Sequence, residues 1–154
     1  PRRHPTGSVR LEPFEGFHTA TGMIVIAAAN DRLFATLART LGHPEWPADP
    51  RFRTNADRQR HKQVLLAEIE DLLRTRPAAE WLRILESAGI PCAPINTLPD
   101  VLAEPQTAAS EILQAIPGHD LRIVALPLRF DGERPPLPGG TPGLGEHTKQ
   151  IRDR

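Results

Sequence analysis

Seventeen prolines limit where helices and strands can run in this chain of 154 residues. Proline has no amide hydrogen and disfavours helical backbone at the residue before it, so regular structure is confined to the segments between prolines. Many of them lie in two arms, at Pro1, Pro5 and Pro13 and again at Pro127, Pro135, Pro136, Pro138 and Pro142. The pattern predicts a folded middle with arms that lie on another surface.

The charge and cysteine content exclude several classes of protein. Lys and Arg together number 19, and so do Asp and Glu, so the net charge is near zero. A neutral chain argues against binding to nucleic acid or to an acidic membrane surface. No apolar stretch reaches the length of a membrane span, and Cys92 is alone. We therefore expect a cytoplasmic protein without disulfides.

The first half of the chain alternates between strand and helix patterns. Residues 14–18 and 23–29 are typical of two strands, with Gly22 in the turn between them. Asn30 is a suitable N-cap for a helix over residues 31–41, which Gly42 ends. Further helices are predicted from Asn55, with an apolar stripe through Leu65, Leu66, Ile69, Leu72 and Leu73, and from about Ala78 to Ala88. Arg58, Arg60, Lys62, Glu68 and Glu70 fall largely outside that stripe, and Trp81 lies on the inward face of the later helix.

The second half is richer in prolines and turns. Pro91 and Pro94 predict an extended edge segment over residues 90–95, and Thr97 is expected to cap a short helix over 98–103. A second helical turn is expected at 105–110. Residues 112–116 and 121–126 form a predicted hairpin, and a last helix is expected near 146–151. The predicted fold is α+β: a short, mostly antiparallel sheet packed against several helices, followed by an extended Pro-rich segment.

No residue type in this chain is arranged as a recognisable catalytic or metal-binding motif. The six histidines share no helix face with another ligand at i+4, so no metal site is predicted. Cys92 has no basic neighbour in the sequence to lower its pKa and is interpreted as an inert thiol. Glu146, His147 and Thr148 are adjacent, whereas catalytic acids, bases and hydroxyls rarely converge from adjacent positions. The pair Asp57 and Arg58 is interpreted as a helix cap with a surface or interface ion pair.

Several short motifs, in order, nevertheless resemble one enzyme family. They are Thr19-Ala20-Thr21-Gly22, Asn30-Asp31, Asp49-Pro50-Arg51-Phe52, Asn55-Ala56-Asp57-Arg58, Glu80-Trp81, Ala88 to Ile95, Leu126-Pro127-Leu128 and Leu144-Gly145-Glu146-His147-Thr148. Together they resemble the C-terminal portion of the class III CoA-transferases of CaiB/BaiF type. This family includes formyl-CoA transferase, carnitine CoA-transferase and α-methylacyl-CoA racemase. Because the sequence also begins at Pro1, we expect a piece of a longer enzyme.

The resemblance implies a division of labour between domains. In the family, a large N-terminal domain carries an Asp whose carboxylate attacks the acyl-CoA thioester, and a small α+β domain follows before the chain returns to the large domain. It implies a linker over residues 1–7, the small domain over 8–116 and the return segment over 117–154. The nucleophilic Asp is expected in the N-terminal domain. Asp31, Asp49, Asp57 and Asp100 match other positions of the family, so none of the residues in this chain is assigned a catalytic role.

The resemblance also suggests which residues lie near a substrate. Phe14, Glu15, Gly16, Phe17 and His18 match a loop region that lies near the active site of the transferases and can shield it from water. This chain lacks the glycine run of formyl-CoA transferase and keeps only Gly16, which argues against a preference for formyl or oxalate. The residue pattern alone supports a second interpretation, in which 14–18 is simply the first strand.

The expected function is that of an acyl-CoA transferase fragment. The implied partners are the N-terminal domain of the same enzyme, a second subunit in an interlocked homodimer, and acyl-CoA and carboxylate substrates. No cofactor is expected apart from coenzyme A as part of the substrate, and the isolated chain is expected to be inactive. Three alternatives stay open: a fragment of an α-methylacyl-CoA racemase, a free-standing non-catalytic interaction domain, and a hydrolase built around His147.

Overall fold

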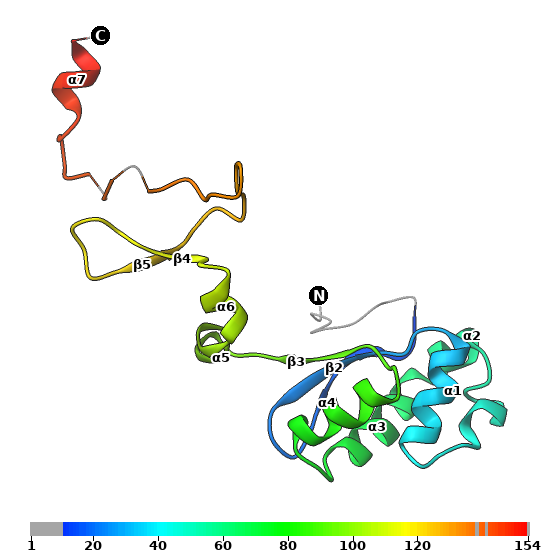
Figure 1. Ribbon diagram of the computed structural model, residues 1–154. Coiled ribbons are helices and arrows are strands. Elements are labelled where there is room, and N and C mark those ends of the chain that lie inside the picture. The colour runs from blue at the N-terminus through cyan, green and yellow to red at the C-terminus, as the bar shows by residue number, and fades with distance from the viewer. Residues whose placement is uncertain (1–10, 138, 141, 154) are drawn as a thin grey trace. The chain divides into compact units, whose positions relative to one another are not determined.

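The computed structural model describes residues 11–137, 139–140 and 142–153, and these fold as two compact units (Figure 1). The first unit ends at Asn96 and the second begins at Thr97. The linker expected at residues 1–7 lies outside the described residues. Among the described residues, none of the helices has both the length and the apolar character needed to cross a membrane.

A three-stranded antiparallel sheet forms the centre of the first unit. Its strands are β1 (Phe14–His18), β2 (Met23–Ala27) and β3 (Cys92–Ile95), in the order β1-β2-β3. Gly22 occupies the turn between β1 and β2 with a φ of +77°, a backbone conformation that glycine adopts without strain. Both predicted strands are confirmed, although β2 ends two residues earlier than expected. The segment with two prolines is an edge strand, as its sequence predicted.

Four helices and one 3₁₀ turn complete the first unit: α1 (Asp31–Thr40), η1 (Trp46–Ala48), α2 (Asn55–Arg60), α3 (Lys62–Leu73) and α4 (Ala78–Ser87). The Asn30 side chain caps α1, where its Oδ1 accepts from the Leu33 amide at 2.8 Å. Helix α3 lies against β1, and α4 lies against β2 and β3 (Figure 1). The helices therefore shield one face of the sheet.

Two details of the predicted second helix were wrong. Thr54, not Asn55, is the N-cap: its hydroxyl accepts from the Asp57 amide at 3.2 Å, and the Asp57 carboxylate accepts from the Thr54 amide. This reciprocal arrangement frees the Asn55 side chain for another contact. The helix is also interrupted at His61, where α2 ends and α3 begins.

The hydrophobic core lies entirely in the first unit. It contains Phe17, Ile24, Ile26, Ala28, Phe34, Leu37, Ala38, Leu41, Trp46, Phe52, Leu65, Ile69, Leu73, Trp81, Leu85 and Ile90. The predicted stripes of the helices supply most of these side chains. Trp81 is buried and its indole Nε1 donates to the Leu73 carbonyl at 2.8 Å, which satisfies the one polar group of that ring.

The second unit is built from short elements: α5 (Leu98–Ala103), α6 (Pro105–Ala109), β4 (Leu113–Ala115), β5 (Arg122–Val124) and α7 (Thr148–Arg152). The predicted hairpin is confirmed as the antiparallel pair β4 and β5. Thr97 caps α5 as expected: its hydroxyl accepts from the Asp100 amide at 3.5 Å, and its own amide donates to Asp100 Oδ2 at 2.8 Å. The seven helices and two small antiparallel sheets of the described residues confirm the α+β class. The assignment of 8–116 to a small domain and 117–154 to a return segment stays a prediction.

Candidate functional site

The five residues expected near a substrate form strand β1, and they divide between its two faces. Phe17 is 1% exposed in the core, opposite Ile24 of β2. Glu15 lies opposite Ile26, so it shares this inner face. Phe14, Gly16 and His18 alternate with them and lie on the outer face, opposite Ala27, Val25 and Met23. The segment is thus a strand, and only three of its five side-chain positions face away from the helices.

The outer face of the sheet is apolar around those three positions. Strand β3 extends it with Ala93 opposite Val25 and Ile95 opposite Met23. Phe14 is 38% exposed, and His18 is the ionisable side chain of β1 on this side. An apolar surface with one imidazole can line a binding site, but it supplies no nucleophile of its own.

Arg58 joins four segments of the first unit and is itself 0% exposed. Its Nε donates to the Glu12 carbonyl at 2.8 Å and its Nη1 to the Phe52 carbonyl at 3.0 Å. Its Nη2 pairs with Asp31 Oδ1 at 2.7 Å, and the guanidinium lies 4.4 Å from the centre of the Phe34 ring.

The pair Asp57 and Arg58 was interpreted as a helix cap with a surface or interface ion pair. The cap is confirmed, because the Asp57 carboxylate accepts from the Thr54 amide. Arg58, however, is buried by the tertiary fold and pairs with Asp31.

A second buried charge cluster lies beside the start of β1. Lys62 Nζ contacts Glu12 Oε1 at 2.6 Å and Glu15 Oε2 at 2.9 Å, so one ammonium serves two carboxylates. Glu12 is 1% exposed, and within the described residues its Oε2 has no hydrogen-bond partner. The Glu12 amide donates to Asn55 Oδ1 at 3.0 Å. Glu12, which precedes Pro13 and β1, is therefore bound by three side chains of α2 and α3: Asn55, Arg58 and Lys62.

The pKa values in this cluster follow from burial and from the shared ammonium. Burial is the largest influence on the pKa of Glu12 and raises it, although the hydrogen bond and charge of Lys62 act in the opposite direction. Desolvation lowers the pKa of Lys62, but its bonds to Glu12 and Glu15 outweigh that effect, and the pKa lies above its ordinary value. The shared ion pairs therefore favour the charged form of Lys62, whereas burial favours the protonated form of Glu12.

Cys92 and His147 lack the surroundings of catalytic residues. Burial raises the pKa of the Cys92 thiol, and the charge of Glu86 adds to the increase, so the thiolate is disfavoured. Glu146 accepts from the Gly143 amide at 2.6 Å, and the Thr148 amide donates to the Gly145 carbonyl at 3.0 Å. The Glu146 carboxylate and the Thr148 amide thus make local contacts at the start of α7. Within the described ranges, no three His, Cys, Asp or Glu side chains form a group that would hold a metal ion.

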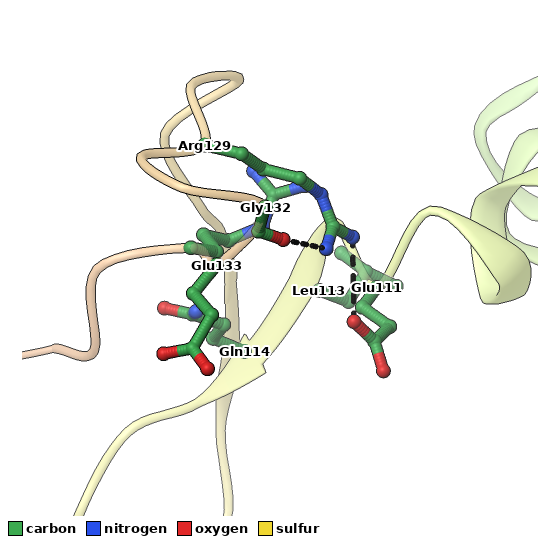
Figure 2. A pocket seen from close by; sticks show the side chains of 7 residues that line it. Glu111, Leu113, Gln114, Arg129, Gly132 and Glu133 are labelled. Atoms are coloured by element: carbon green, nitrogen blue, oxygen red, sulfur yellow. Dashed lines mark hydrogen bonds and ion pairs between the residues drawn. The ribbon is translucent and has the colours of Figure 1, made fainter.

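The second unit contains a polar pocket of about 380 Å³ that the sequence did not indicate (Figure 2). Figure 2 shows Arg129 between the Gly132 carbonyl, which accepts at 3.1 Å, and the Glu111 carboxylate at 3.3 Å. Arg134 donates to the carbonyls of Ser110 and Leu126. Backbone carbonyls occupy much of the two guanidiniums, and the Glu111 carboxylate pairs with Arg129. Arg129 and Arg134 thus connect the segment after β5 to residues 110–111, which lie between α6 and β4.

Among the described residues, neither the outer sheet face, nor the charge clusters, nor the polar pocket brings together a nucleophile, a base and an orienting group. The outer sheet face offers apolar contacts, and the charge clusters hold backbone segments in place. The arginines and carboxylates of the charge clusters are visible in the sequence. Their partners are remote in the sequence, so no spacing rule pairs them.

Comparison with known proteins gives one consistent family. A family model described as CoA-transferase family III matches residues 1–148. An acetyl-CoA:oxalate CoA-transferase of Acetobacter aceti is 34% identical over 155 residues, which cover 97% of this chain and 37% of that protein. An acyl-CoA transferase of Fusarium pseudograminearum is 30% identical, with 97% of this chain and 33% of that protein covered.

A solved structure shows the same relation. The crystal structure of a CaiB/BaiF family protein from Brucella suis superposes with a TM-score of 0.79 at 31% identity. It covers 99% of this chain, and the match covers 40% of that protein. The chain therefore spans between a third and two fifths of the length of these relatives.

Proposed function

The chain belongs to CoA-transferase family III, and from that premise we propose that it forms the C-terminal part of an acyl-CoA transferase. The whole enzyme would move CoA from a thioester to a carboxylic acid. One observation carries the proposal: nearly the whole chain matches about a third of the length of an acyl-CoA transferase and of a CoA-transferase. The nucleophilic Asp would belong to the N-terminal domain of that enzyme.

The lack of a catalytic constellation in the described residues supports this division. One face of strand β1 packs on the core, and the other carries Phe14, Gly16 and His18. We assign to this outer face the role of a wall over the thioester, contributed by the small domain. CoA would enter as part of the substrate, without a resident cofactor, in a cytoplasmic enzyme that forms an interlocked homodimer.

The first test compares the isolated chain with the longer enzyme. Acetyl-CoA or succinyl-CoA would be supplied with oxalate or glutarate, and the new thioester measured by chromatography. We expect transfer by the longer enzyme and none by the purified 154-residue chain, because the attacking carboxylate would be missing from it. Transfer by the isolated chain, or its absence from the longer enzyme with every acceptor tried, would contradict the proposal.

The second test addresses the wall. Phe14→Ala in the longer enzyme should lower kcat/KM for the acyl-CoA about tenfold, since a lost apolar contact with the substrate has an effect of this order. Val64→Ala is the matched control, because Val64 is 43% exposed on α3 and does not belong to the sheet. The two variants should unfold at the same urea concentration. An unchanged kcat/KM in Phe14→Ala would remove this role from β1.

A further inference from the structure

The chain enters strand β1 through a buried charge cluster that is not balanced. Lys62 Nζ lies 2.6 Å from Glu12 Oε1 and 2.9 Å from Glu15 Oε2, so one ammonium compensates two carboxylates. The side chains of Glu12, Glu15 and Lys62 are 1%, 12% and 26% exposed. When both acids are ionised, the cluster therefore keeps one net negative charge with little access to water. A charge in such surroundings destabilises the closed arrangement.

Glu12 is the less well stabilised of the two carboxylates. Its Oε2 is buried and, in the part of the chain that the structure describes, has no hydrogen-bond partner. An ionised carboxylate is stabilised when both of its oxygens accept hydrogen bonds, so the surroundings of Oε2 disfavour the charged form. Burial raises the pKa of Glu12, Lys62 opposes the increase, and the charge of Glu15 adds to it. One proton on Glu12 makes the whole cluster neutral.

The main chain of Glu12 is held separately from its carboxylate. Asn55 Oδ1 on α2 accepts from the Glu12 amide at 3.0 Å, and Arg58 Nε on the same helix donates to the Glu12 carbonyl at 2.8 Å. The Arg58 guanidinium also pairs with Asp31 Oδ1 at 2.7 Å, so its charge is already compensated. Lys62 on α3 binds the Glu12 carboxylate itself. Three contacts thus fix Glu12, and one of them depends on a titrating group.

We propose that Glu12 acts as a proton-controlled latch for the segment that enters β1. With its proton bound, Glu12 is neutral and stays inside, and Lys62 neutralises Glu15. After the proton is lost, the carboxylate gains hydration by leaving the interior, so residues 11–13 open more often. Phe14 follows on the outer face of the sheet, so the latch controls where that face begins. The latch follows from the contacts of Glu12, whereas its effect on the wall over the thioester also rests on the proposed function.

Hydrogen exchange of the 154-residue chain tests the latch. The Glu12 amide donates to Asn55 Oδ1 and therefore reports on opening. Its protection factor, the ratio of intrinsic to observed exchange rates, should fall at least about threefold from pH 5 to pH 8, because the closed form binds the proton more tightly than the open form. The amide of Ile69, which is 0% exposed in the core, reports on global unfolding and should stay more protected at both pH values. Equal protection of the two amides would overturn the proposal, since the segment would then open only with the whole unit.

Three variants identify the titrating group. Glu12→Gln cannot release a proton and should show no fall in protection between the two pH values. Glu15→Gln removes the like charge, so the fall should become smaller, and it decides alone if Glu12→Gln does not fold. Glu68→Gln is the matched control, because Glu68 lies on the same helix as Lys62 but pairs with Arg51 at 3.3 Å. Its fall should equal that of the unaltered chain.

A fall that persists unchanged in Glu12→Gln or in Glu15→Gln would place the titrating group elsewhere and overturn the latch. Failure of the proposed function would be seen separately, as the absence of CoA transfer by the longer enzyme. That result would leave the exchange of the Glu12 amide in the 154-residue chain unaffected.

Discussion

Replacing Arg58 with alanine should lower the free energy of unfolding of this chain by about 3–5 kcal/mol. The side chain is 0% exposed and donates to the Glu12 and Phe52 carbonyls, so its removal leaves buried acceptors without a donor and opens a cavity beside Phe34. The effect would be measured by urea unfolding followed by circular dichroism. Failure of the variant to fold would also indicate a large loss of stability.

Three controls separate the parts of this effect. Asp31→Ala removes one of the three hydrogen-bond partners and the counter-charge of the buried guanidinium, so it should cost less than Arg58→Ala but more than a substitution at an exposed ion pair. Arg60→Ala removes a neighbouring guanidinium that is 68% exposed and should have a small effect. Arg58→Lys keeps the charge but cannot reach three acceptors at once, so it should still be clearly destabilised. A loss below about 1 kcal/mol in Arg58→Ala would show that the carbonyls find other donors.

Replacing Lys62 with methionine should cost about 2–3 kcal/mol at pH 8. The change leaves the carboxylates of Glu12 and Glu15 without the cation that they share. The estimate is below the usual cost of breaking a fully buried pair because the Lys62 side chain is 26% exposed. Urea unfolding at pH 8 and at pH 5 would measure the cost.

The sign of its pH dependence follows from the raised pKa of Glu12. A carboxyl whose pKa is higher in the folded than in the unfolded protein holds its proton more tightly when folded, so it favours folding below the unfolded pKa. That contribution is lost as the pH rises through the folded value. Lys62 is the group that opposes the increase, so Lys62→Met raises the pKa of Glu12 further. The cost of the variant should therefore shrink from pH 8 toward pH 5.

Glu12→Gln supplies the matched rescue for this prediction. Combined with Lys62→Met, it removes the buried charge that has lost its partner, so the double variant should recover much of the lost stability at pH 8. It should also flatten the pH dependence, because the titrating group is gone. If the double variant is as unstable as Lys62→Met alone and titrates in the same way, the pH-dependent charge lies elsewhere.

The sequence patterns predicted the helices and strands but not the contacts of the buried charge clusters. Arg58 lies off the apolar stripe that the sequence predicts over residues 65–73, and a charged residue in such a position is normally exposed. Its partners Asp31 and Glu12 lie 27 and 46 residues away, and no spacing rule links them. The N-cap was mispredicted for a related reason: Thr54 caps the helix, and the Asn55 side chain accepts from the Glu12 amide, which is 43 residues away in the sequence.

The candidate site was also predicted only in part. The sequence identified residues 14–18 as a strand or a loop near a substrate, and the alternation of a strand explains which of them can face outward. It could not show that Glu15 is committed to Lys62, because that contact crosses from β1 to α3. The polar pocket around Arg129 depends on a fold that joins residues 110–114 to 126–134, and it had no local signature.

The sequence by itself determined the order of the elements, most of their boundaries, the α+β class and the resemblance to an enzyme family. These follow from prolines, caps, glycine turns and apolar periodicity, which act over a few residues. Only the tertiary structure decided that Arg58 is buried, that one lysine serves two carboxylates, and that the core lies in the unit that ends at Asn96 while Leu98, Val101 and Leu102 of α5 are exposed. These features depend on which remote segments pack together, and the desolvation and pairing of charges are set by that packing.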